Sequence, residues 1–552
     1  MPTATGSTSY CKTGFTGTLW LLLFAIGGVL PHLTGCTTGE RLAALRHDTA
    51  QLLQEAQFSL FGSDVQVEVL DIDAYQPWLP PSDSPAKILR MDLRQTLEIA
   101  ARHSRSYQNA RETLYSSALS LRSQQHAWDW NPTNNFSALL GIDQDPSSTT
   151  FSSSSSLGFT RRFLSGGRLS ASLAMATLRY CTGDRRVSIQ SLANLTLNQP
   201  LLAGSGPLVN REPLTQAERN LIYALRSYIR TREQLLINVA DLYYAVLNAE
   251  ANLRISEQNH ASLEYSLKLS EAKREGGRVT QSDVDQARQR LLNAQSNIVS
   301  AREAIQNAKD DLKIALAIPL DQEIEVDRTD MEMLEKHVLP RPAIPLETAV
   351  SQALSRRLDF ATVRDRLEDA ERAVKIAEDG MRAKLDFTAS AAAAGGHGNS
   401  HIGFPRIGGT DFSFGLNAEL PLDRLQQTIV LRRAQIALAQ QKREVDAARD
   451  SLVRNLRRTW NNLRSYAQRV EIQKMAIAIA LRRVENNRLL FEDGRIAIRE
   501  YLDSQDDLSN ARNSLAQQLV SHRKCWLQLL YELDELKVDP QTLWTSQLNI
   551  GG

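Results

Sequence analysis

The chain has 552 residues, and its 64 Lys and Arg nearly balance its 63 Asp and Glu, giving a formal net charge of +1. No global field would therefore attract nucleic acid or an anionic membrane surface. Hydrophobic residues make up 42% and mean hydropathy is −0.32. Beyond the N-terminal region no apolar run reaches about 18 residues, which excludes a protein with several membrane-spanning helices. Length alone suggests about three or four domains, a count that the internal repeats overturn.

The N-terminal region resembles a bacterial lipoprotein leader. Residues 15–30 form an apolar run preceded by Lys12, of a length typical of a signal peptide. The sequence LTGC, which ends at Cys36, resembles the lipobox, whose cysteine is acylated, commonly with palmitate, and becomes the mature N-terminus. We predict a lipoprotein signal peptide over 1–35, a lipid anchor on Cys36, and an N-terminal extension and linker over 36–90. The alternative is a signal peptide that merely ends near a cysteine.

The rest of the chain is an internal duplication of one unit. An offset of 217 residues places Gly277 on Gly494 and Arg278 on Arg495, and the flanking apolar positions also match. A segment that begins near residue 91 likewise matches one that begins near residue 345. We predict a single duplicated protomer with these parts: a first repeat over 91–320, an equatorial connector over 321–344, a second repeat over 345–536 and a C-terminal tail over 537–552.

Each repeat has the same internal order of helical segment, β-like segment, long helix, glycine turn and shorter helix. The predicted helices are 92–128, 214–275 and 281–316 in the first repeat, and 346–383, 428–491 and 498–535 in the second. The long helices would measure about 95 Å, which is too long for a globular core. The helix over 281–316 alternates large residues with alanine along one seam, a pattern typical of coiled coils: Val284, Ala287, Leu291, Ala294, Ile298, Ala301, Ile305, Ala308, Leu312 and Ala315.

The segments 133–197 and 386–420 alternate apolar and polar residues with period two. Strands of about 9 to 11 residues with one apolar face are typical of transmembrane β-barrels, although a half-buried soluble sheet gives the same alternation. A few strands per chain cannot close a barrel, and open strand edges cannot lie in lipid. Several chains would therefore have to contribute strands to one barrel. The fold class that we predict is mainly α with a transmembrane β part.

The two β segments differ in length. The first contains the sequence RRFLSGGRLSAS, whose Gly166-Gly167 pair is typical of a tight turn between two alternating runs. We therefore favour four strands in the first repeat. The alternative is two long strands that carry an elaborate outer loop.

These features together resemble the TolC family of outer-membrane efflux proteins. The resemblance covers nearly all of 91–536 and depends on the duplicated order, the segments NQPLL and ELPLD that end the β regions, and the tips GGRVTQSDV and DGRIAIREYL. It implies a homotrimer with a shared β-barrel in the outer membrane and a long periplasmic α-barrel. It also implies a passive exit duct, closed at the helix tips until a periplasmic adaptor and an inner-membrane transporter engage it. The family's usual contribution is two strands from each repeat.

The resemblance assigns roles to tip residues. Glu500 and Asp503 match positions of acidic rings at the periplasmic pore constriction, where three copies would favour cations. Two solvated acids at a helix start are the alternative. The remaining tip gate and adaptor-contact positions are Gly277, Arg278, Ser282, Asp283, Gly494 and Arg495. The glycines are expected at positive φ, and Ile496 stands where the family has a gate arginine.

The sequence contains no motif of an enzyme active site or cofactor-binding loop. His397 and His401 lie in a glycine-rich loop, where their spacing does not bring them together, so we expect no metal site. We also expect no cofactor and no nucleic acid partner. The competing function is a structural coiled-coil lipoprotein that spans the envelope and conducts nothing.

Overall fold

The computed structural model describes residues 38–61, 88–141, 149–180, 187–336, 339–342, 344–395, 409–539, 541–545 and 548. The chain divides into two compact units, residues 1–69 and 70–552. The described part of the first unit is one helix, α2 (Thr38–Phe61). Cys36, the linker beyond α2, and the loop with His397 and His401 lie outside the described residues. Within the described ranges, no helix combines the length and the apolar character needed to cross a membrane.

The second unit contains both repeats. The first repeat comprises β1 (Leu89–Met91), α3 (Leu93–His103), α4 (Arg105–His126), β2 (Asn131–Gly141), β3 (Thr150–Arg162), β4 (Arg168–Tyr180), β5 (Val187–Pro200), α5 (Pro207–Asn210), α6 (Glu212–Glu275) and α7 (Gln281–Leu316). The connector holds β6 (Ile324–Val326) and α8 (Thr329–Lys336). The second repeat comprises α9 (Leu346–Arg356), α10 (Leu358–Asp379), β7 (Lys384–Gly395), β8 (Thr410–Glu419), α11 (Leu425–Glu492) and α12 (Ile498–Glu532).

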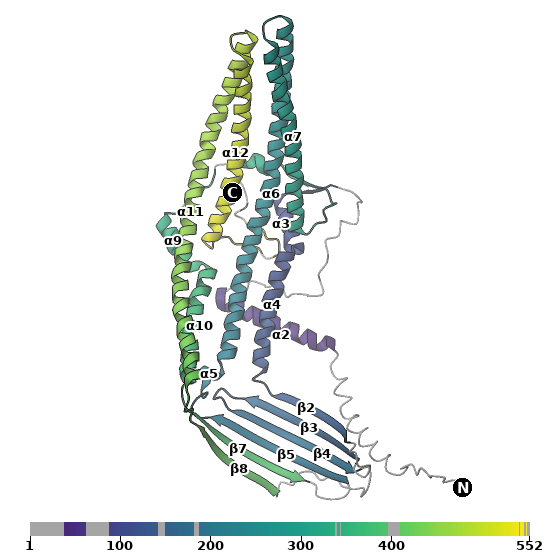
Figure 1. The fold of residues 1–552 in the computed structure, drawn as a ribbon, viewed down its shortest axis with the longest axis vertical. Coiled ribbons are helices and arrows are strands. Elements are labelled where there is room, and N and C mark those ends of the chain that lie inside the picture. Colours follow the sequence, from purple (N-terminus) through teal and green to yellow (C-terminus); the bar gives the residue numbers. More distant parts are fainter. Residues whose placement is uncertain are drawn as a thin grey trace, which may run out of the picture. The chain divides into compact units, whose positions relative to one another are not determined.

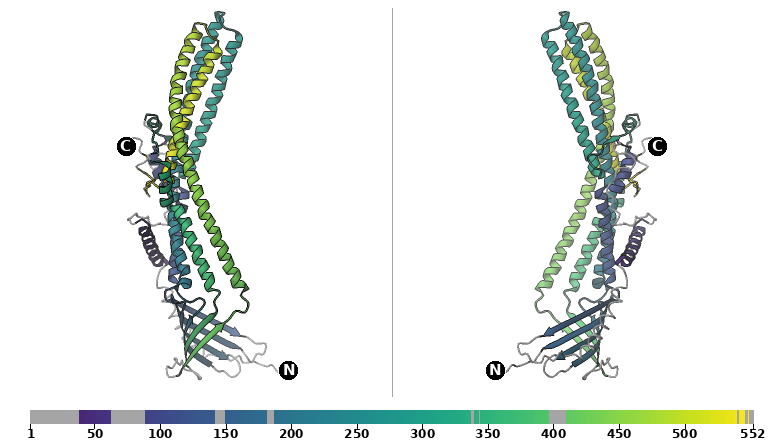
Figure 2. Two further views of the ribbon diagram at one scale, coloured as in Figure 1. Left: turned by 90° about the vertical axis from the view of Figure 1, so that its left-hand side faces the viewer. Right: turned by 90° about the vertical axis from the view of Figure 1, so that its right-hand side faces the viewer.

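The helices form pairs along the unit (Figure 1). At the end opposite the sheet, α7 packs along α6 and α12 packs along α11. On the strand side, α4 replaces α7 beside α6, and α10 replaces α12 beside α11. Two shorter helices thus run alongside each long helix. Figure 2 shows the four tip helices side by side at the end away from the strands.

The leading helical segment of each repeat differs from the prediction of one continuous helix. The chain leaves helical geometry at Ser104, between α3 and α4, where φ is −60° and ψ is 120°. It does so again at Arg357, between α9 and α10, where φ is −59° and ψ is 121°. An offset of 253 residues aligns the two positions, just as it aligns Leu93 with Leu346. The break is therefore part of the repeated unit, although neither position is a glycine or proline.

Six antiparallel strands form one sheet in the order β2-β3-β4-β5-β7-β8. Four of them come from the first repeat, so the four-strand prediction is confirmed. The pairing of β5 with β7 joins the two repeats. A separate two-stranded parallel sheet pairs β1 with β6.

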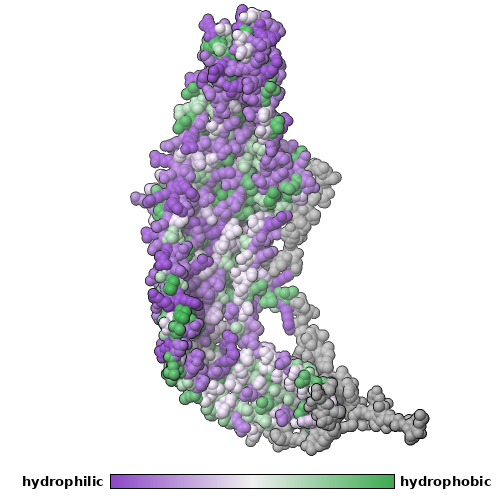
Figure 3. Space-filling model, in the orientation of Figure 1, coloured by the Kyte–Doolittle hydropathy of each residue, from purple (hydrophilic) through white to green (hydrophobic). Residues whose placement is uncertain are grey.

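The register of the sheet gathers the apolar positions on one face. Leu157 pairs with Leu173, and Leu195 pairs with Ala391, which in turn pairs with Phe412. Many of these side chains are exposed within one chain; Phe414, for example, is 74% exposed. In Figure 3 the strand region is largely white and green, whereas the helices are mostly purple. The opposite face carries mainly small polar side chains, together with Leu139, Leu178 and Leu192. Its hydroxyls meet between strands: Ser137 with Ser154 at 2.7 Å, and Ser390 with Ser413 at 2.6 Å.

Candidate functional site: the helix tips

Each repeat turns at its tip through the same glycine motif. Gly277 has φ +70° and Gly494 has φ +76°, a conformation that favours glycine, so the prediction from the sequence is confirmed. The amide of Arg278 donates to the Lys273 carbonyl at 2.8 Å, and that of Arg495 donates to the Leu490 carbonyl at 2.8 Å. Each glycine amide donates to a carbonyl three residues earlier. Both long helices therefore end in a Schellman motif, which satisfies their last carbonyls.

The two tips share one hydrophobic core. Its fully or nearly buried members come from α6, α7, α11 and α12: Leu263, Ala287, Ala294, Phe491, Ile498, Tyr501 and Leu502. Ile496, which occupies the position of the family's gate arginine, packs against this core as a half-buried residue. The turn of the second repeat is therefore held by apolar packing at that point.

The start of α7 uses one of the predicted gate residues as a cap. Asp283 accepts hydrogen bonds from the backbone amide and hydroxyl of Thr280 at 2.9 and 2.7 Å, and its own amide donates to the Thr280 hydroxyl. This reciprocal capping box satisfies amides that the first turn of a helix leaves unpaired. The side chains of Ser282 and Arg278 are exposed beside it. Arg495 is also exposed and lies 3.9 Å from Asp493.

Asp503 lies in an ion-pair cluster that joins α7 to α12. Arg290 donates to the Asp503 carboxylate at 2.9 Å and also binds Asp506. Arg499 lies 3.8 Å from the other oxygen of Asp503. Burial raises the pKa of Asp506, and Arg290 opposes that rise. The side chain of Glu500 is exposed, so the two predicted ring carboxylates have different surroundings.

Lys273 makes a contact between the two tips that sequence reasoning missed. Its ammonium group donates to the carbonyls of Phe491 and Glu492 at 2.6 and 2.8 Å, and it lies 4.9 Å from the centre of the Phe491 ring. A lysine of α6 thus caps the C-terminal end of α11. In the sequence, a lysine in the last turn of a helix is ordinary. Its partners lie more than two hundred residues away, so local pattern gives no signal for them.

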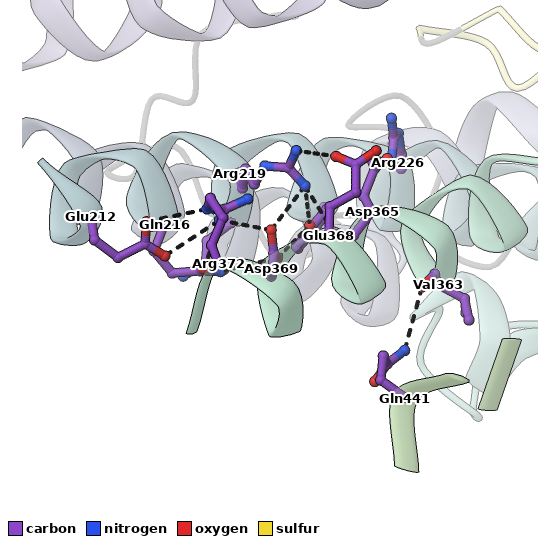
Figure 4. Close-up of polar contacts among 12 residues, drawn as sticks. Glu212, Gln216, Arg219, Arg226, Val363, Asp365, Glu368, Asp369, Arg372 and Gln441 are labelled. Atoms are coloured by element: carbon purple, nitrogen blue, oxygen red, sulfur yellow. Dashed lines mark hydrogen bonds and ion pairs between the residues drawn. The ribbon is translucent and has the colours of Figure 1, made fainter. Parts of the chain in front are cut away.

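A second polar cluster joins the repeats on the strand side of the unit, between α6 and α10 (Figure 4). Arg219 lies 2.5 Å from Glu368 and 2.8 Å from Asp369, and Arg226 lies 2.6 Å from Asp365. Around them, Arg372 pairs with Glu212 and Asp369, and Gln441 of α11 donates to the Val363 carbonyl. Because these charges are partly buried and interlinked, they hold α6 against α10 more firmly than isolated surface pairs would.

The described residues contain no group of three or more His, Cys, Asp or Glu side chains arranged to hold a metal ion. Cys525 is buried as a free thiol, and burial raises its pKa to about 12.

Long paired helices with glycine turns at one end and an open amphipathic sheet at the other define a class of fold in which two helix-strand-helix repeats share one sheet. The family model for "Outer membrane efflux protein" matches residues 117–317 and 349–529, which is more than half of the chain. The chain belongs to the outer membrane efflux protein family.

Individual relatives are distant. The chain is 24% identical to outer membrane protein TolC of Escherichia coli K12 over 303 residues, which cover 52% of this chain and 59% of TolC. The match to TolC of Vibrio cholerae is 22% identical and covers 55% of this chain and 68% of that protein. The chain thus matches about three fifths to two thirds of these relatives' length.

Solved structures support the fold. The outer-membrane protein VceC of Vibrio cholerae superposes with a TM-score of 0.60 at 16% identity, covering 80% of this chain and 95% of VceC. The CmeC outer-membrane channel of Campylobacter jejuni gives a TM-score of 0.59 at 14% identity, covering 83% of this chain and 87% of CmeC.

Proposed function

We propose that this protein is the outer-membrane channel component of a multi-protein efflux or secretion system. Three copies form a passive exit duct, with the helices in the periplasm and the strands pooled in the outer membrane. The observation that carries the proposal is the six-stranded open sheet, apolar on one face and polar on the other, attached to helices too long for a globular core. Such a sheet is stable in lipid only when its edges are closed by other strands.

The sheet also separates this function from the alternative, a non-conducting coiled-coil lipoprotein. A spacer needs no membrane-embedded strands with a polar inner face. Membrane fractionation combined with native gel migration tests the two: a trimer in the outer-membrane fraction is expected. A monomer in the soluble fraction would overturn the duct.

The tips serve as the gate in this proposal. Glu500 and Asp503, repeated in three copies, would surround the pore and favour cations. Arg290 supplies the counter-charge that holds Asp503, in place of a cation at position 496. Replacing both acids with Ala should lower cation selectivity and cation block of single-channel currents in planar bilayers. Glu303→Ala, an exposed acid far from the tip on α7, is the matched control. Unchanged currents in the double variant would remove the ring.

The exposed tip residues Arg278, Ser282 and Arg495 are the proposed contact for a periplasmic adaptor, which connects the duct to an inner-membrane transporter. Charge reversal of both arginines should abolish copurification of the adaptor while trimers persist. Retained copurification would place the contact elsewhere.

Cys36 is the proposed lipid anchor. Cys36→Ser should abolish labelling with radioactive palmitate, and persistent labelling would contradict the anchor. The duct itself leaves the choice of cargo to the transporter.

A further inference from the structure

The two repeats contribute unequal numbers of strands. The second repeat supplies β7 and β8, whereas the first supplies β2 to β5. The extra hairpin is β3-β4, which is inserted between the strands that connect to α4 and α6. Its two strands pair with each other along their full length, and with β2 and β5 on either side. The hairpin is therefore part of the wall of the sheet.

The helix-side turn of this hairpin is fixed to the segment that leads into α6. The amide of Gly206 donates to the Ser165 carbonyl at 3.1 Å, and the Gln199 side chain donates to the same carbonyl at 3.0 Å. Gly166 has φ +94°, and a Cβ there would lie 2.7 Å from Asn210 Nδ2. Only glycine fits so close an approach. The turn is thus built to hold the hairpin against the helical part.

The hairpin continues both faces of the sheet. On the apolar face, Leu157 and Phe159 of β3 lie beside Leu173 and Ala171 of β4, although Ser153 and Ser155 of β3 also lie on this face. On the opposite face, β3 places Ser152, Ser154 and Ser156, and β4 places Ser170 and Ser172. A hairpin that served only as an outer loop would not need this match, because alternation across neighbouring strands matters only where one face meets lipid and the other meets water.

The free edges of the sheet are complementary to each other. β2 and β8 end the strand order, and they run in opposite directions relative to the helices. The same apolar face carries Phe136 and Leu140 at one edge and Phe412 and Phe414 at the other, all exposed by half or more. The edge β8 of one copy can therefore pair antiparallel with β2 of the next and continue the apolar band.

We propose that three copies close an eighteen-stranded barrel, in which the β3-β4 hairpins widen the outer exit. This proposal rests on the trimeric duct of the proposed function. Because barrel diameter grows roughly linearly with strand number, the exit would be about half as wide again as one built from two strands per repeat. Barrels of about 16 to 18 strands leave an open aqueous channel.

The proposed lumen also has a distinct chemistry. Most of its central side chains are short and uncharged, among them Ser154, Ser172, Asn194, Thr196 and Ser390, although Leu139, Leu178 and Leu192 lie on the same face; charged residues lie toward the strand ends. Short side chains leave the lumen open, and hydroxyl and amide groups offer hydrogen bonds without selecting the sign of a charge. The exit would therefore suit bulky, hydrated polar solutes, and charge selection would be confined to the helix tips.

The experiment measures the exit separately from the tips. Ser390→Cys places a thiol on the lumen face of β7, and Ala391→Cys, the next residue, places one on the lipid face as a control. Maleimide-linked polyethylene glycols of increasing size are added to the outer side of proteoliposomes that contain the full-length trimer. The same labelling is then repeated after deletion of residues 150–180, which removes β3, its turn and β4 and leaves β2 to pair with β5.

We expect the deletion to reduce the radius of the largest polymer that labels the Ser390→Cys variant by about one third or more, in proportion to the loss of six of eighteen strands. The thiol of the Ala391→Cys variant should remain unlabelled in both backgrounds. An unchanged size limit would overturn the wide exit. Electron microscopy of the unaltered trimer provides a count of strands that needs no variant, and twelve strands would also overturn the inference. Absence of any trimer in the membrane would instead contradict the proposed function.

Discussion

The long helices α6 and α11 come from the same repeated unit, yet they have different surroundings. In α6, 23 of 64 residues are buried, against 7 of 68 in α11. Helices α4, α7, α10 and α12 all pack on α6, whereas α11 contacts mainly α10 and α12. Its surface carries exposed apolar side chains: Val430, Ile436, Ile472, Met475, Ile479, Leu481 and Leu489.

This difference indicates what a second copy would supply. One protomer covers much more of α6 than of α11 and leaves one side of α11 uncovered. Helix α7 also has an exposed apolar stripe, formed by Leu292, Val299 and Ile314. Two such stripes on opposite margins of the protomer are what a closed ring of identical subunits requires. Four predictions test the contrast between the helices.

The largest effect is expected from the double change Met475→Asp and Ile479→Asp on α11. If this stripe meets another copy, each carboxylate would be buried without a partner at three equivalent contacts, at a cost of several kcal/mol each. Size-exclusion chromatography with light scattering in detergent should then find monomers. Lys474→Asp, on the other side of the same helix, should leave trimers intact. Trimers in the double variant would exclude the stripe from the interface.

The next largest effect concerns Lys273, through which α6 caps α11. Lys273→Met keeps the length and apolar stem of the side chain but removes the ammonium donor from two carbonyls. The Phe491 carbonyl keeps the Gly494 amide as a donor, so the loss falls mainly on the Glu492 carbonyl, at a cost of about 1 to 3 kcal/mol. Hydrogen exchange of the amides in the second tip should accelerate accordingly. Lys268→Met, which removes an exposed pair with Glu264, should change exchange little. Equal exchange in the two variants would mean that the cap contributes nothing.

A third prediction uses acids at equivalent positions. Glu233 of α6 is buried, and an offset of 217 residues places it on Asp450 of α11, which is exposed. Burial raises the pKa of Glu233 from 4.5 to about 8, against the opposing attraction of Arg230. Between these two pKa values, Glu233 therefore stays protonated in the folded protein, whereas it loses its proton in the unfolded chain. Stability should fall as pH rises from about 5 to 8.

Glu233→Gln should reduce this pH-dependent loss of stability by about 1 to 2 kcal/mol between about pH 5 and 7. Asp450→Asn should leave it unchanged. Thermal unfolding midpoints at a series of pH values provide the measurement. Identical pH profiles for the Glu233 variant and the unaltered protein would show that this acid is ionised in the folded state.

The smallest effect is expected where the repeats are alike. Gly277→Ala and Gly494→Ala should each cost about 1 kcal/mol, because both residues have positive φ while no atom lies within 4 Å of the added Cβ. Gly276→Ala, where φ is −82°, should cost nothing. Local hydrogen exchange at each tip measures the effect, and unequal costs at the two glycines would mean that the turns differ.

Much of the fold follows from local pattern. The helix predicted over 281–316 is observed as Gln281–Leu316, since Thr280 and Asp283 form its cap and its seam repeats every three or four residues. The period of two in the β segments likewise predicts which residues share a face, and the register agrees. The breaks at Ser104 and Arg357 could not be predicted, because neither residue type interrupts a helix by itself.

The candidate site was predictable to a lesser degree. Its glycines were predicted because they belong to a repeated motif at a turn, whereas Glu500 and Asp503 were predicted only from the resemblance of the tip to the family. The side chains that hold it, Lys273 and Arg290, gave no signal, because their partners lie 213 to 219 residues away in the chain.

The sequence by itself determined the helices, the alternating strands and the turns, because each depends on residues within a few positions of one another. It also determined the duplication, because similar sequence recurs at a fixed offset along the chain. Only the tertiary structure decided the strand order, the pairing of β5 with β7, the fixed β3-β4 hairpin and the unequal burial of α6 and α11. These features depend on which distant segments meet. Equivalent segments of the two repeats therefore form a largely packed helix, α6, in the first repeat and a more solvent-exposed helix, α11, in the second.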